Sequence, residues 1–122
     1  MILVDSSIWI DYLRSGDVIL AHLLEEGSVL THPFVLGELA LGNLRHREQI
    51  LDNLLALPGI IPATNDEVMH FINASRLYGK GIGFVDAHLL ASVRIAPGSR
   101  IWTRNKHLDA LARQMNIAHS QT

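Results

Sequence analysis

MILVDSSIWIDYL (residues 1–13) contains an apolar run that is followed directly by a carboxylate. Ile2–Val4 is continuous, apolar and partly β-branched, which is typical of a short buried strand. Ser6 or Ser7 can then cap a helix over Ile8–Leu13. Asp5 therefore ends a strand that we expect to be buried, where an unpaired charge is costly.

The same alternation of strand and helix continues to the end of the 122 residues. Further strands are predicted at 29–31, 60–61, 101–102 and 117–118, and further helices at 17–26, 33–41, 47–57, 64–78, 84–95 and 105–115. Asp17 and Thr64 are the expected caps of two of these helices, the latter with Glu67 at capping-box spacing. This order predicts an α/β fold, a three-layer α/β/α sandwich with a central, mostly parallel sheet, as a single domain over residues 1–122.

The composition excludes several classes of protein. An apolar fraction of 48% favours a folded core, and the lack of cysteine excludes disulfides and thiolate metal sites. No apolar run approaches the roughly 18 residues of a membrane span, and no secretory signal is apparent, so we expect a cytoplasmic protein. The net charge of −2 does not suggest a nucleic-acid binder. Five cations nevertheless gather late in the chain, as either a solvated face or a phosphate-facing patch: Arg94, Arg100, Arg104, Lys106 and Arg113.

Most carboxylates lie where water is expected, at helix starts or on polar helix faces. Asp109 precedes Arg113 by four residues and Asp11 precedes Arg14 by three, so each couple has the spacing of a surface ion pair on a helix.

Three acids do not fit that pattern. Asp5 follows an apolar strand, Glu38 stands four residues after Phe34, and Asp86 stands three residues before Leu89, so each shares a face with apolar residues. No arginine is close to them in sequence, and a divalent cation is the other physical solution. Mg²⁺ or Mn²⁺ accepts such oxygen ligands. A structural alternative remains for Asp86, which can cap the first turn of its helix.

Strand ends strengthen the case for a shared site. In parallel sheets, ligands bind beyond the carboxyl ends of the strands, and both Asp5 and Thr103 directly follow predicted strands. Other signals are weak: the seven histidines show no zinc-binding spacing, and GKGIG (residues 79–83) lacks the Ser/Thr and the preceding strand of a phosphate loop. We expect that segment to be a flexible loop.

Four blocks of the sequence resemble one known family. VDSSIWIDYL, HPFVLGELALG, FVDAHLLAS and IWTRNKHLDALA occur in the order and at about the spacing of PIN-domain proteins, and more narrowly of VapC-type toxins of toxin–antitoxin pairs. The resemblance covers nearly the whole chain and implies a PIN-like α/β fold with acids gathered at one edge of the sheet. By motif, Asp5, Glu38 and Asp86 match the first three catalytic, metal-binding acids. Asn105 stands where a fourth acid is expected, so it is only a tentative metal ligand.

The resemblance implies a Mg²⁺- or Mn²⁺-dependent endoribonuclease in which activated water attacks phosphorus in line, leaving 5′ phosphate and 3′ hydroxyl ends. The residues expected to position the substrate or waters are Ser6, Thr103, Arg104 and Lys106. The expected partners are RNA, a cognate antitoxin and a second copy of the chain. Apolar residues around Leu36, Leu39, Leu51 and Leu54 suit either an antitoxin groove or ordinary core packing.

Two alternatives stay open from the residues alone. A phosphorylation receiver module shares the length and the α/β alternation, but such a module needs adjacent acids after its first strand, and here Ser6 follows Asp5. A PIN binding protein that is catalytically weakened by Asn105 is the other. Acetyl-phosphate labelling would identify the receiver, and metal-dependent RNA cleavage would separate the enzyme from the binding protein.

Overall fold

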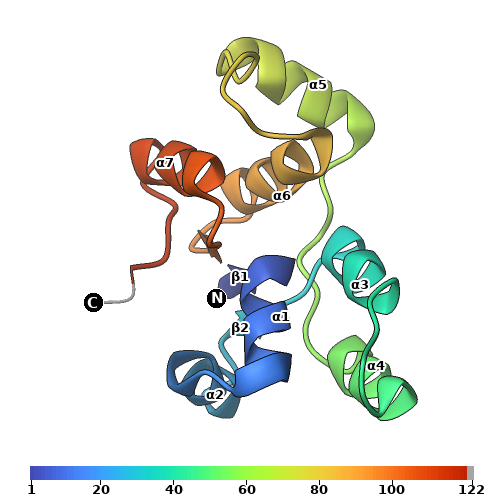
Figure 1. Ribbon diagram of the computed structural model, residues 1–122. Helices are drawn as coiled ribbons and strands as arrows, with labels where there is room; N and C mark the ends of the chain where they lie inside the picture. The colour runs from blue at the N-terminus through green and yellow to red at the C-terminus, as the bar shows by residue number, and fades with distance from the viewer. Residues whose placement is uncertain (121–122) are drawn as a thin grey trace.

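The sheet is parallel and has three strands in the order β2-β1-β3 (Figure 1). The computed structural model describes residues 1–120. β1 (Ile2–Val4) lies in the centre, with Leu3 opposite Leu30 of β2 (Val29–Leu30) and opposite Ile101 of β3 (Arg100–Trp102). The predicted α/β architecture with a parallel sheet is confirmed.

Two predicted strands are reduced to single bridges, Thr31 with Gly59 and Ile101 with Ala118. Near Gly59 the pairing cannot lengthen, because Pro58 and Pro62 flank the segment and proline has no amide hydrogen to donate to a ladder. Ile60 is buried, whereas Ile61 is exposed to solvent. The prediction of a strand at 60–61 was therefore wrong.

Seven helices within residues 1–120 connect and cover the strands: α1 (Ser6–Ser15), α2 (Val18–Glu25), α3 (Pro33–Ala40), α4 (Arg47–Leu55), α5 (Asn65–Ala74), α6 (Phe84–Ile95) and α7 (Lys106–Gln114). Asp17 caps α2, and Thr64 and Glu67 form the predicted capping box of α5. α1 begins earlier than expected, because Asp5 rather than a serine caps it. None of these described helices combines the length and the apolar character that a bilayer crossing requires.

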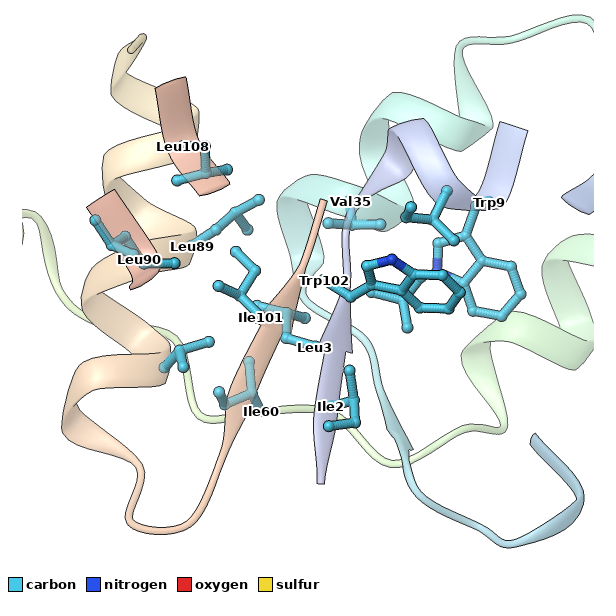
Figure 2. Packing of buried hydrophobic residues seen from close by; sticks show 14 of the residues in the cluster. Ile2, Leu3, Trp9, Val35, Ile60, Leu89, Leu90, Ile101, Trp102 and Leu108 are labelled. Atoms are coloured by element: carbon cyan, nitrogen blue, oxygen red, sulfur yellow. The ribbon is translucent and has the colours of Figure 1, made fainter. Parts of the chain in front are cut away.

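Helices cover both faces of the sheet, which is the predicted three-layer arrangement. Figure 2 shows Leu89 and Leu90 of α6, with Leu108 of α7, on one side of the strands, and Trp9 of α1 and Val35 of α3 on the other. Since both faces are occupied, the strand residues are apolar, except for the exposed Arg100 that begins β3. Polar chemistry is left to the strand ends.

The leucines of α3 and α4 serve mainly as core residues. Leu39 and Leu54 are buried at 2% and 4% exposure, and Leu36 and Leu51 are half-buried against the same core. Of the two interpretations of these residues, core packing accounts for Leu39 and Leu54.

Candidate active site

Asp5 is the centre of the polar cluster at the carboxyl edge of the sheet. Its side chain is buried at 6% exposure and accepts hydrogen bonds from the Ser6 amide at 2.8 Å and the Thr103 hydroxyl at 2.6 Å. The Ser7 hydroxyl donates to the same carboxylate at 3.2 Å. Because β1 and β3 are adjacent and parallel, the residues after them meet, as the sequence predicted for Asp5 and Thr103.

Glu38 approaches Asp5 from α3. The Ser6 hydroxyl lies 3.3 Å from Glu38 Oε2 and 3.5 Å from Asp5 Oδ1, so one hydroxyl stands between two carboxylates. Glu38 was expected to lie away from water because of its apolar neighbours on the helix, but the residue is largely exposed on α3. Partial burial of the carboxyl and then the charge of Asp5 raise the pKa of Glu38 above 4.5, against a lowering by the Ser6 hydrogen bond; Asp86 also raises it.

Asp86 is the third residue of α6 and is half-buried. Its Oδ2 atom accepts a hydrogen bond from the Gly83 amide at 3.3 Å, so it also caps the helix, as the structural alternative proposed. Burial raises the pKa of Asp86, the Gly83 hydrogen bond lowers it, and the negative charge of Asp5 raises it further. Asp86 can therefore cap α6 and belong to the group of acids at the same time.

None of the three acids forms an ion pair within residues 1–120. All ion pairs between side chains in the part of the chain that the structure describes lie elsewhere, at His22–Glu26, Arg104–Asp11, Arg104–Asp17 and Arg113–Asp109. Hard carboxylate oxygens and uncompensated negative charge suit Mg²⁺ or Mn²⁺. Within residues 1–120, no three acidic or histidine side chains stand as close together as the ligands of a metal-binding group.

Arg104 is exposed, but its guanidinium is already paired with carboxylates. Its Nε atom donates to Asp11 at 2.5 Å and its Nη2 atom donates to Asp17 at 3.3 Å, while its backbone amide donates to the Ser7 hydroxyl at 3.1 Å. The predicted Asp11–Arg14 pair is replaced by this contact, whereas the predicted Asp109–Arg113 pair is confirmed at 2.7 Å. Arg104 thus ties the loop after β3 to α1 and to the cap of α2.

Asn105 has a structural role as the cap of α7. Its side-chain oxygen accepts hydrogen bonds from the amides of His107 and Leu108 at 3.0 and 3.1 Å, and its own amide donates to Thr103 Oγ1 at 3.0 Å. An oxygen that already serves two donors has limited capacity for a metal ion. Lys106, the first residue of α7, is exposed.

Two supporting groups were missed from the sequence. Ser7 joins Asp5 to Arg104, and its place within the first turn of α1 was the available signal. The second is an aromatic cluster in which the Phe34 ring contacts His32 and His88, and Phe84 contacts His88, with ring centroids 4.6–5.2 Å apart. It joins α3, which carries Glu38, to α6, which carries Asp86.

Both histidines of this cluster are buried and neutral. Burial and then the nearby His88 lower the pKa of His32 to about 4, and burial lowers the pKa of His88. The cluster therefore brings no counter-charge to the acids at neutral pH. The ring of His32 also caps α3, because its Nδ1 atom accepts from the Phe34 amide at 3.0 Å.

Two comparisons with known proteins identify the family of this chain. The PIN domain family matches residues 2–114. Proteins of two Mycobacterium tuberculosis strains, each named Ribonuclease VapC32, are 44% identical to this chain over 118 residues, which cover 97% of this chain and 95% of the relative. A parallel three-stranded sheet with three acids at its carboxyl edge, and a family match over nearly the full length, together place the chain in the PIN domain family.

Proposed function

We propose that this protein is an endoribonuclease that hydrolyses RNA phosphodiesters and acts as the toxin of a VapBC-type toxin–antitoxin pair. Its membership of the PIN domain family and the names of its relatives support this proposal. The single observation that carries it in this chain is the trio of uncompensated carboxylates, Asp5, Glu38 and Asp86, at the carboxyl edge of the sheet. Fixed, repelling charges of this kind mark functional sites.

Asp5, Glu38 and Asp86 are the residues that would hold Mg²⁺ or Mn²⁺. When bound, such an ion supplies Lewis-acid polarisation of the phosphodiester and makes water more acidic. Asn105 adds at most a neutral oxygen, because that oxygen caps α7. We therefore assign the negative charge of the site to three acids rather than four.

The surrounding residues fix the acids in place. The Thr103 hydroxyl donates to Asp5 Oδ2, and the Ser6 amide donates to Oδ1, so both oxygens of the carboxylate have a fixed donor. The Ser6 hydroxyl holds Glu38 near Asp5, and the Gly83 amide orients Asp86. Acids held in this way orient water and phosphate for in-line attack, which leaves 5′ phosphate and 3′ hydroxyl ends.

The proposed partners are an RNA substrate, a cognate antitoxin and a second copy of the chain, in the cytoplasm. These proposals rest on the family. Exposed apolar side chains at the end of α3 and of α4, Leu41 and Leu55, are available on the surface for such contacts.

Purification without an antitoxin, followed by incubation with RNA, tests the proposed activity. We expect cleavage with Mg²⁺ or Mn²⁺, no cleavage with chelator, and no cleavage by a folded Asp86→Asn protein prepared in the same way. Cleavage that survives both the chelator and this substitution would come from a contaminant or from metal-free chemistry, and would contradict the proposal. A folded wild type that binds RNA but never cuts it would favour the weakened binding protein.

The Asn105→Asp substitution tests whether a fourth acid at position 105 contributes to metal binding. Aspartate caps helices as well as asparagine does, so α7 should remain intact. The added charge should tighten Mn²⁺ binding, measured by calorimetry. Unchanged Mn²⁺ affinity would indicate that position 105 lies outside the metal site.

A further inference from the structure

Basic residues near the acid site differ in whether their charge is already used. Arg104 is paired with Asp11 and Asp17, and Arg113 is paired with Asp109. Lys80 and Lys106 are exposed, and neither forms an ion pair with any residue from 1 to 120. A cation that is already neutralised gains little from a phosphate, so the two lysines are the better phosphate ligands.

Lys80 lies in the glycine loop (residues 79–83), and this loop packs on the start of α7. Gly81 has a φ of +82°, and a Cβ atom placed there would lie only 3.1 Å from the Cγ and Nδ1 atoms of His107. The backbone of Gly81 therefore lies directly against the His107 ring. His107 follows Lys106, and Gly81 follows Lys80, so this contact brings the two lysine-bearing segments side by side.

The same two segments lead directly to the acids. The last residue of the glycine loop, Gly83, donates its amide to Asp86, the third acid. The residue that caps α7, Asn105, donates its amide to Thr103, which in turn holds Asp5. Both lysines are thus fixed, through short stretches of backbone, to side chains of the acid site.

We propose that the glycine loop and the first turn of α7 form a phosphate-binding rim, in which Lys80 and Lys106 contact RNA backbone phosphates beside the scissile bond. This inference rests on the proposed ribonuclease function and names where the substrate strand runs. In it, Gly81 and His107 are positioning residues, because their contact holds the glycine loop against the first turn of α7. Arg104 is assigned to structure and not to the substrate.

Salt-dependent binding tests the two lysines. The probe is a fluorescein-labelled single-stranded RNA of mixed sequence, and the protein carries Asp5→Asn so that RNA is not consumed. Each phosphate contact contributes about 0.7 to the slope of log affinity against log salt for a single strand. Lys80→Gln and Lys106→Gln should each lower that slope by about 0.7 and weaken binding about fivefold at 0.1 M salt. Arg94→Gln, the same charge change in the last turn of α6, should change neither value.

Two glycine variants test the loop contact. Gly79 and Gly81 both have positive φ, so alanine strains the backbone at either position, but only Gly81 packs against His107, and nothing lies within 4 Å of a Cβ at Gly79. Gly81→Ala should weaken RNA binding severalfold more than Gly79→Ala, with α-helical content unchanged by circular dichroism. Equal effects of the two substitutions would overturn the positioning role.

Different results would overturn the proposed phosphate-binding rim and the proposed ribonuclease function. Wild-type protein that cleaves RNA with Mn²⁺, while Lys80→Gln and Lys106→Gln bind with unaltered slope, would overturn the rim alone. Wild-type protein that neither binds nor cleaves RNA would overturn both. Cleavage by the wild type, with the reduced slopes described above, supports both.

Discussion

Two charged clusters lie at the same edge of the sheet and differ in how their charge is compensated. In the Arg104 network (Arg104, Asp11, Asp17 and Ser7), one guanidinium faces two carboxylates. In the acid trio (Asp5, Glu38 and Asp86), no carboxylate is paired with a cation within residues 1–120. Burial first, and also the negative charge of Asp5, raise the pKa of Glu38 and of Asp86. Charge that is already balanced holds the fold together, whereas charge left unbalanced is available for a ligand.

The two clusters are joined by a single side chain. The Ser7 hydroxyl donates to Asp5 and accepts from the Arg104 amide, so the balanced cluster supports the unbalanced one. This difference in role predicts different consequences for substitutions only a few residues apart.

Removing a charge from the trio should have the largest effect. Asparagine at position 5 still caps α1, so the Asp5→Asn protein should fold. Residues that hydrogen-bond to metal ligands typically contribute about 10–100-fold to activity, so loss of a ligand itself should cost more than about 100-fold in RNA cleavage. Cleavage rates with Mn²⁺, beside circular dichroism of the same preparation, measure this. Near-normal cleavage by the folded variant would refute the role of the trio.

Removing the hydroxyl that orients Asp5 should have the next largest effect. Thr103→Val deletes the 2.6 Å hydrogen bond to Asp5 and also the acceptor for the Asn105 amide. We expect cleavage to fall by about 10–100-fold. Thr103→Ser keeps the hydroxyl and should retain most of the activity. A serine variant as weak as the valine variant would show that shape at this position, rather than the hydrogen bond, is what matters.

Breaking the balanced cluster should have the smallest effect on RNA. Arg104→Gln removes two partly exposed ion pairs, each worth no more than about 1 kcal/mol. We expect a modest loss of unfolding free energy in urea and an unchanged salt dependence of RNA binding. If this variant instead lost a phosphate contact in the salt titration, Arg104 would belong to the substrate site.

The sequence predicted elements well where the signal was local. The cap at Asp17, the capping box at Thr64 and the bounds of α6 depend on residues within a few positions of one another. The meeting of Asp5 and Thr103 followed from a rule about parallel strand ends.

Long-range pairing was not predictable in the same way. Asp11 was paired with Arg14 because they are close in sequence, but its partner is Arg104, 93 residues away. Helical spacing placed Glu38 on the same face as Phe34, but it cannot tell whether another element covers that end of α3. Glu38 is exposed there, so its raised pKa, and not deep burial, is what marks it.

A cation bound at the trio should relieve the repulsion among its carboxylates, and thermal unfolding measures this effect. When the pKa of a carboxyl is raised in the folded state, the free energy of unfolding of the protein falls as pH rises through that pKa. In chelator at pH 7, Glu38→Gln should therefore melt above the wild type. Saturating Mn²⁺ should raise the melting temperature of the wild type and raise that of Glu38→Gln much less.

Glu48→Gln is the matched control, because Glu48 is exposed on α4, outside the trio. This variant should show the wild-type response to Mn²⁺. We expect the difference in melting temperature between wild type and Glu38→Gln, seen in chelator, to narrow or reverse when Mn²⁺ is added. Identical melting temperatures for wild type, Glu38→Gln and Glu48→Gln, with and without Mn²⁺, would contradict it.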